Sequence, residues 1–273
     1  MNTTSKAPAP TGAESKRTLL LVLIGGFFVA NALIAEFIGV KVFSLERTLG
    51  FSPLDWPLTD SYRLSLNISA GVLLWPLEFS IADLINEYFG QRGIKLLSYL
   101  AVGFIGYAFV MIAFAIWLTP ADFWILRQTD QGPLNMDLAF DAVFSQGMWI
   151  IAGSLVAFLV GQLLDVRVFH LVKRYTGEGR LWLRATGSTF VSQLVDSFIV
   201  LAIAFHFNPA TQWELKTILL LGLVKYFYKF IMAILLTPLI YLLHRLIDNY
   251  LGEPLATEMK REAMSQSRTA SGV

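Results

Sequence analysis

The stretch GQLLDVRVFHLVKRYTGEGRLWLRATGSTFVSQLVDSFIVLAIAFHF, residues 161–207, determines how the rest of the chain is interpreted. It joins the end of one apolar helix to a second apolar helix through a strongly basic turn, and both helices have the composition of membrane-embedded segments. A carboxylate at the centre of a bilayer helix costs about 2.5–3.5 kcal/mol on insertion scales, so it normally faces a partner or a hydrated cavity. The acids and amides of these two helices therefore predict a polar pocket inside the membrane.

The composition of the whole chain agrees with a membrane protein. Of its 273 residues 55% are hydrophobic and only 15% are charged, which leaves too few polar residues to cover a soluble domain of this size. Cysteine is absent, which excludes disulfides, thiolate metal sites and cysteine nucleophiles. The three histidines form no His-x-x-x-His pair, so we expect no metal site and no cofactor.

The apolar segments predict an all-α, polytopic fold. An apolar run of about 20 residues is long enough to cross about 30 Å of hydrocarbon. We expect six spans, at about Leu19–Val40, Ile68–Phe89, Ile94–Leu118, Met148–Val172, Ala185–Phe207 and Thr217–Leu243. A cleaved signal peptide ending at Ala32 is the alternative for the first run, but the apolar sequence continues past that position.

The polar segments define the expected boundaries. Residues 1–17 are predicted to be a disordered tail, residues 18–248 the transmembrane domain, and residues 249–273 a polar tail that is disordered or forms a short surface helix. The segments Lys41–Leu66 and Thr119–Gln146 are expected to be loops. The positive-inside rule is satisfied when both termini are cytoplasmic and the acidic Thr119–Gln146 loop is outside.

Two polar stripes are the candidate binding residues. Thr189, Gln193 and Asp196 fall at positions i, i+4 and i+7 of the fifth span, with Ser188 on the flank of this stripe. The fourth span carries Gln162 and Asp165, three positions apart. A carboxylate can accept two adjacent N–H donors and an amide can complement a carbonyl, so such stripes suit a planar, hydrogen-bonding ligand.

The first two spans add further polar residues. Asp83 and Glu87 are four positions apart in the second span and lie on one helical face. In the first span, Asn31 and Glu36 do not share a face, and Glu36 is interpreted as an interfacial acid near the outer end.

Structural roles remain open for these polar residues. Hydroxyl and amide groups within spans often act only as interhelical hydrogen bonds. The acids can instead form structural ion pairs, which would join Asp83, Asp165 or Asp196 to Lys229, Arg167 or Arg184. For Glu87, solvation at the helix end competes with a binding role.

Three separated motifs resemble those of the queuosine-precursor transporter family. They are AGVLLWPLEFSIADLINEYFG (residues 70–90), GQLLDVRVF (residues 161–169), and Arg184 to Ser197 followed by Lys229 and TPLIY (residues 237–241). The resemblance implies a six-helix fold similar to the substrate-binding components of energy-coupling-factor transporters. It also implies import of 7-deazaguanine bases such as preQ0 and preQ1 across the bacterial inner membrane, for salvage into tRNA modification.

The resemblance also implies a set of substrate-binding positions. The motifs carry over the positions Asp83, Asn86, Glu87, Gln162, Asp165, Arg184, Gln193, Asp196 and Lys229. We add Asn31 and Ser188 to this set of candidate binding residues. The expected partners are a small deazapurine and the lipid bilayer, without nucleic acid. A homo-oligomer or an energising partner is left open.

Other functions are weighed against import. A vitamin-type substrate-binding subunit of a multi-component transporter is the main alternative, and a structural membrane subunit is the second. The chain lacks cysteine and paired histidines, and it contains no Gly-x-x-x-x-Gly-Lys-Ser/Thr element, so we expect no enzymatic activity.

Overall fold

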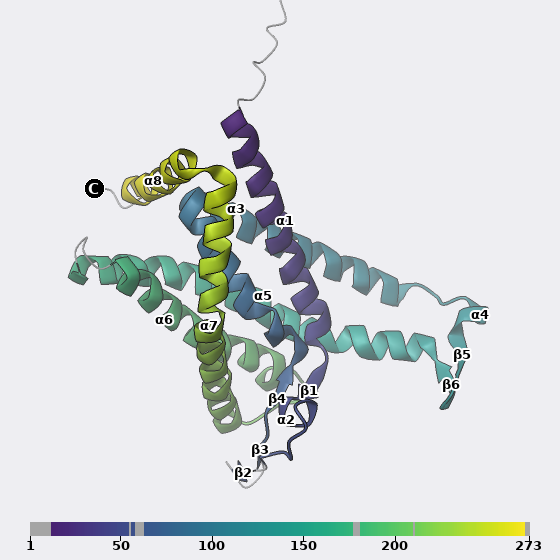
Figure 1. The fold of residues 1–273 in the computed structure, drawn as a ribbon. Helices are drawn as coiled ribbons and strands as arrows, with labels where there is room; N and C mark the ends of the chain where they lie inside the picture. The colour runs from purple at the N-terminus through teal and green to yellow at the C-terminus, as the bar shows by residue number, and fades with distance from the viewer. Residues whose placement is uncertain (1–11, 55, 58–62, 177–180, 210, 271–273) are drawn as a thin grey trace, which may run out of the picture.

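The computed structural model describes residues 12–54, 56–57, 63–176, 181–209 and 211–270, with the side chains of some helical residues, among them 165–167 and 181–189, outside the described part. The described residues are mostly helical and form a bundle of long helices with a projecting arm (Figure 1). The helices are α1 (Gly12–Gly39), α2 (Leu45–Thr48), η1 (Ala70–Leu73), α3 (Trp75–Trp117), α4 (Asp122–Ile125), α5 (Met136–Thr176), α6 (Leu181–Leu201), the π-helix η2 (Ala202–His206), α7 (Leu215–Leu251) and α8 (Glu253–Ala270).

Short antiparallel hairpins interrupt the helices. The strands are β1 (Val42–Ser44), β2 (Trp56–Pro57), β3 (Arg63–Leu64), β4 (Asn67–Ser69), β5 (Leu126–Thr129) and β6 (Gly132–Asn135). They pair as β1–β4, β2–β3 and β5–β6. Because all three pairs lie in connections, the helical class predicted from the sequence is confirmed.

Three helices of the described chain are long and apolar enough to cross a membrane. They are α1 and the segments Ser80–Trp117 of α3 and Met136–Gly161 of α5. This agrees with the prediction of a membrane protein, whereas the full count of six spans and the cytoplasmic position of both termini stay predictions.

The second and third predicted spans form one kinked helix rather than two separate ones. Gly90 has φ +71° and ψ −174° inside α3, a conformation that is essentially restricted to glycine. A Cβ at this position would lie 2.6 Å from Gln266 Oε1 and 3.2 Å from Ala263 Cα, so α8 packs directly against the kink. The predicted start at Ile68 is wrong, because Ile68 lies in β4 and α3 begins at Trp75.

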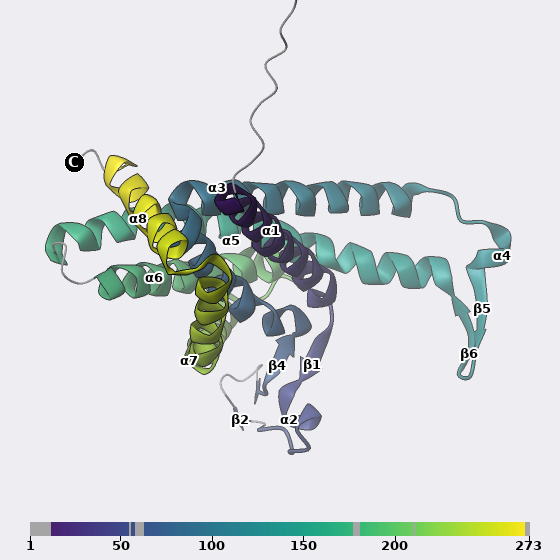
Figure 2. The same cartoon turned by 45° about the horizontal axis from the view of Figure 1, so that its top comes forward.

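The predicted loop Thr119–Gln146 is also much shorter in the structure. Helix α5 already begins at Met136, where the Asn135 side chain accepts a 3.1 Å hydrogen bond from the Leu138 amide and so caps the first turn. The second half of α3 and the first half of α5 run side by side to α4 and the β5–β6 hairpin, which lie at the tip of the arm (Figure 2).

Helix α8 accounts for most of the C-terminal polar tail, as the surface-helix alternative predicted. Its Ala256, Met259 and Ala263 are buried. Arg17 of α1 forms an ion pair with Glu262, and Lys16 Nζ donates a 3.0 Å hydrogen bond to the Tyr250 carbonyl. These contacts join the start of α1 to the end of α7 and to α8, with residues 12–17 helical rather than part of a disordered tail.

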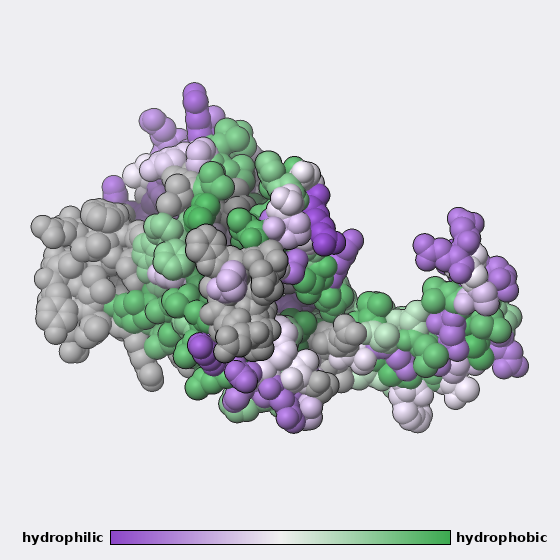
Figure 3. Space-filling view, turned by 90° about the horizontal axis from the view of Figure 1, so that it is seen from below, coloured by the Kyte–Doolittle hydropathy of each residue, from purple (hydrophilic) through white to green (hydrophobic). Residues whose placement is uncertain are grey.

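One hydrophobic core lies where α1 packs against both halves of α3. Phe28 and Ala32 of α1 pack with Ile81 and Ile85 of α3, and Ile151 of α5 joins them. Outside this core, large apolar side chains remain exposed over much of the surface, including along the arm (Figure 3). Such a surface is expected where lipid replaces water.

Candidate functional site

Glu36 of α1 is a buried carboxylate inside the bundle. Its side chain accepts a 2.7 Å hydrogen bond from the Ser154 hydroxyl of α5, and the two residues are only 5% and 8% exposed. Glu36, interpreted from the sequence as an interfacial acid near the outer end of its span, thus has its side chain buried between α1 and α5 rather than exposed. The helix packing, which the sequence does not display, turns this position inward.

Glu78 is a second buried carboxylate, located in the first turn of α3. Asn31 of α1 donates a 2.7 Å hydrogen bond to Glu78 Oε2 and a 3.3 Å hydrogen bond to the Leu74 carbonyl. Glu78 is 3% exposed and Asn31 is 5% exposed. Asn31, a predicted site residue, thus holds an acid that was not in the predicted set.

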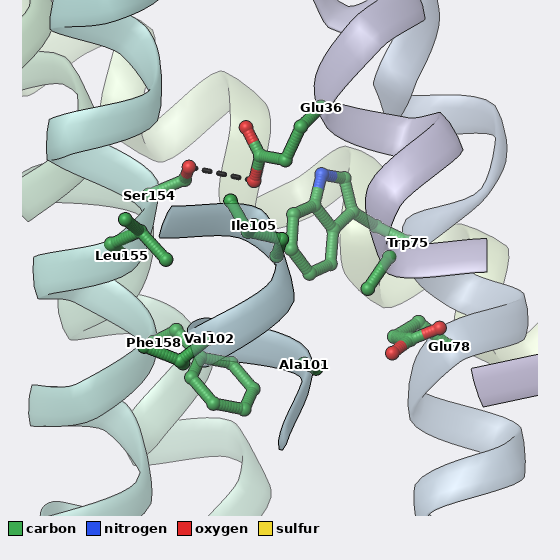
Figure 4. A pocket seen from close by; sticks show the side chains of 10 residues that line it. Glu36, Trp75, Glu78, Ala101, Val102, Ile105, Ser154, Leu155 and Phe158 are labelled. Atoms are coloured by element: carbon green, nitrogen blue, oxygen red, sulfur yellow. Dashed lines mark hydrogen bonds between the residues drawn. The ribbon is translucent and has the colours of Figure 1, made fainter. Parts of the chain in front are cut away.

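Both acids line one small cavity (Figure 4). Its wall also contains Trp75, Ser154 and Phe158, so two carboxylates, a hydroxyl and two aromatic rings border the same space. The volume of about 10 Å³ is enough for about one water molecule. In this closed arrangement the cavity leaves no room for a bicyclic base.

A third polar cluster joins α6 to α7. Lys229 of α7 forms an ion pair with Asp196, and its Nζ also donates a 3.2 Å hydrogen bond to Gln193 Oε1. The structure therefore brings three predicted site residues together, in the ion pair that the sequence left open as an alternative for Asp196. Gln193 and Asp196 meet the same partner because they lie three positions apart on one face of α6.

The third cluster and the cavity are electrostatically connected. Asp196 lies close enough to Glu36 for the two carboxylates to interact, and Lys225 interacts with both Asp196 and Lys229. The bundle thus contains a polar zone to which α1, α3, α5, α6 and α7 all contribute. This polar zone offers three carboxylates as hydrogen-bond acceptors, and an amide, a hydroxyl and an ammonium group as donors.

Asp83, Asn86 and Glu87 lie elsewhere on α3. All three residues are exposed. Glu87 is nine positions from Glu78, which corresponds to about 13.5 Å along a helix. Glu87 contacts His244 at 2.9 Å and Lys260 at 3.6 Å. These contacts place Glu87 beside the kink of α3, where α3, α7 and α8 meet.

The same end of the bundle holds a hydrogen-bond network around the buried Tyr88. Tyr88 donates a 2.7 Å hydrogen bond to Asp248 Oδ1, and Lys260 donates a 3.0 Å hydrogen bond to Asp248 Oδ2. Burial raises the pKa of Asp248, but the hydrogen bonds from Tyr88 and Lys260 outweigh it and bring the pKa below its ordinary value. The network fastens α8 to α3 and α7.

The remaining predicted site residues fall outside the described side chains. These are Gln162, Asp165, Arg184 and Ser188.

The sequence reasoning missed Glu78 and Ser154 as buried polar groups. The available signal was Glu78 itself, an acid within the apolar run LLWPLEF, whereas Ser154 offers no signal before its packing is known. Within the described ranges, no group of three or more His, Cys, Asp or Glu side chains could hold a metal ion.

Comparison with known proteins identifies related sequences. The sequence profile of a family described as "Putative vitamin uptake transporter" matches residues 69–243. A Bacillus subtilis (strain 168) protein named "Probable queuosine precursor transporter" is 29% identical over 194 residues, which cover 67% of this chain and 75% of that protein. No solved structure gives a significant match.

Proposed function

We propose a substrate for this chain, which belongs to the vitamin uptake transporter family and is a membrane transporter. The substrate is a queuosine precursor, a 7-deazaguanine base such as preQ0 or preQ1, which the protein imports across the bacterial inner membrane for salvage into tRNA. The name of the Bacillus subtilis relative supports this class of substrate.

The observation that carries the proposal is the cluster of Gln193, Asp196 and Lys229. A guanine-like edge presents adjacent N–H donors beside a carbonyl oxygen. A carboxylate accepts from the two donors, and an amide N–H or an ammonium group donates to the carbonyl. The cluster supplies each of these groups within one hydrogen-bonded set between α6 and α7.

Binding of the base requires rearrangement of this cluster. Asp196 is engaged by Lys229 in the ligand-free protein, so the base replaces one charged partner of Asp196 with its own donors. Breaking this partly buried ion pair costs free energy, which the hydrogen bonds from the base to Asp196 and from Lys229 to the base carbonyl must offset. The neighbouring cavity must open at the same time, since it holds only about one water molecule.

Aromatic residues near the zone favour a flat ligand. Trp75 and Phe158 border the cavity that contains Glu36 and Glu78. Aromatic faces stack on heterocycles with little dependence on their substituents, so these rings add affinity while the polar cluster provides selectivity.

Labelled uptake tests the proposal. Cells that cannot make the base are given the transporter and labelled preQ1, with unlabelled preQ1, guanine or riboflavin as competitor. We expect uptake that preQ1 abolishes and that riboflavin leaves unchanged. Equal competition by riboflavin would favour the vitamin-type alternative, and absence of transporter-dependent uptake would overturn the assignment.

A further inference from the structure

In the described part of the chain, the hydrogen-bond partner of the Glu36 side chain is the neutral Ser154 hydroxyl. Glu36 is 5% exposed. In the part of the chain that the structure describes, neither Glu36 nor Glu78 takes part in an ion pair. A buried charge without a counterion is expensive, and a carboxylic acid avoids this cost by holding its proton.

The surroundings of Glu36 add to this preference. Glu36 lies three residues before the C-terminal end of α1, where the helix dipole disfavours a negative charge. Glu78 of α3 faces the same cavity, and Asp196 of α6 interacts with Glu36.

The cations of α7 do not offset these charges, because Lys229 is paired with Asp196 and Lys225 interacts with the same pair. The cavity residues of α5, which are Ser154, Leu155 and Phe158, carry no ionisable group.

Glu78 has a different environment. It lies in the first turn of α3, where the helix dipole favours a negative charge, and the Asn31 amide donates to it. Among the described residues neither acid of the cavity has an ion pair, and Glu36 differs from Glu78 in lying at an unfavourable helix end and near the Asp196 carboxylate.

Ser154 is arranged to accommodate both protonation states of Glu36. Its Oγ lies 2.7 Å from Glu36 Oε1 and 3.1 Å from the Ile151 carbonyl, yet a hydroxyl has one proton to donate. When Glu36 is charged, Ser154 donates to it and the Ile151 carbonyl loses this donor. When Glu36 is protonated, it can donate to Ser154 while Ser154 donates to Ile151, so both hydrogen bonds are formed.

We propose that Glu36 is the proton-binding site that couples import to the proton gradient, an inference that rests on the proposed function. In the closed bundle Glu36 is neutral beside a cavity that holds about one water molecule. Opening the cavity hydrates the carboxyl group and allows it to ionise, and closing it again requires a proton. One proton is thus taken up on the outer side and released on the inner side in each import cycle.

The test uses the purified full-length protein in liposomes with labelled preQ0, a neutral base. Two readouts are compared: exchange of labelled for unlabelled base without any gradient, and accumulation driven by a more acidic exterior. For the wild-type protein we expect both activities, and we expect a protonophore to abolish accumulation alone.

The matched variants are Glu36→Gln and Glu258→Gln, of which the second changes an exposed acid on α8. Glu36→Gln places a neutral hydrogen-bonding group where the protonated acid would be, so its exchange rate should no longer depend on pH and its accumulation ratio should fall to about one, the value for uncoupled equilibration. Glu258→Gln should behave as wild type. Accumulation by Glu36→Gln, or a wild-type protein that exchanges base without responding to the pH gradient, overturns the proton site and leaves the proposed function intact. Absence of wild-type exchange overturns both.

Discussion

Asn31 and Glu78 form a buried contact between α1 and α3, in which the Asn31 amide donates a 2.7 Å hydrogen bond to the Glu78 carboxyl group. The Asn31 amide also reaches the Leu74 carbonyl at 3.3 Å, so both of its N–H groups have an acceptor. This contact joins the start of α3 to α1 beside the cavity that Glu78 lines.

The Asn31–Glu78 contact predicts a strongly coupled pair of mutations. Asn31→Leu removes the donor and leaves Glu78 buried without its partner, which should lower the free energy of unfolding by about 1–3 kcal/mol. The double variant Asn31→Leu/Glu78→Leu removes both polar groups and should recover most of this loss. Thermal unfolding in detergent measures both effects. Additive losses in the double variant would show that the pair is not coupled.

The kink of α3 predicts an effect of Gly90→Ala on the docking of α8. The substitution forces a strained backbone and places a Cβ 2.6 Å from Gln266 Oε1, so we expect a loss of about 1–3 kcal/mol. Limited proteolysis of α8 together with thermal unfolding checks this. Gly103→Ala is the matched control, because a Cβ there meets no atom within 4 Å and the helix gains stability from alanine. Equal behaviour of the two variants would contradict the account of the kink.

The segment between α1 and α3 predicts an acid-sensitive contact. The Leu66 amide donates a 2.6 Å hydrogen bond to Glu46 Oε1 and is the main reason that the pKa of Glu46 lies below its ordinary value of 4.5. A lowered pKa in the folded state gives stability that is complete above pH 4.5 and is lost as the pH falls through the lowered value.

Hydrogen exchange of residues 63–69, corrected for intrinsic rates, measures this contact. Protection should be high at neutral pH and should decrease on acidification, whereas Glu46→Gln should give protection that changes little with pH. A wild-type profile that is flat through the acidic range would contradict the role of Glu46.

The cluster between α6 and α7 predicts variants that separate transport from folding. Asp196→Asn and Gln193→Ala should abolish uptake while protein levels remain nearly normal, since each leaves Lys229 at least one oxygen acceptor in the cluster. Uptake and membrane abundance are measured on the same cells. A loss of abundance in proportion to the loss of uptake would assign the cluster to assembly rather than to binding.

The helical class was predictable because the apolar runs are long and few residues are charged. The details that failed depend on local capping and on contacts distant in sequence. Asp137 and Asp141 were assigned to a loop, although Asn135 starts helix α5 just before them. The sequence predicts separate spans at Ile68–Phe89 and Ile94–Leu118, because the contact of α8 with the kink at Gly90 is not visible in the sequence.

The candidate site was predictable only where polar residues share one helix face. Gln193 and Asp196 follow this rule and meet at Lys229. The inward position of Glu36 depends on the packing of α1 against α5, and that of Glu78 on the packing of α1 against α3. Helical spacing alone does not specify such pairings between separate helices.

Equilibrium binding of labelled preQ1 to the purified protein in detergent tests the assignment most directly. We predict saturable binding that unlabelled preQ1 displaces, that riboflavin does not displace, and that Asp196→Asn loses while remaining folded. A wild-type protein that binds no preQ1, or from which riboflavin displaces it equally well, would contradict the account.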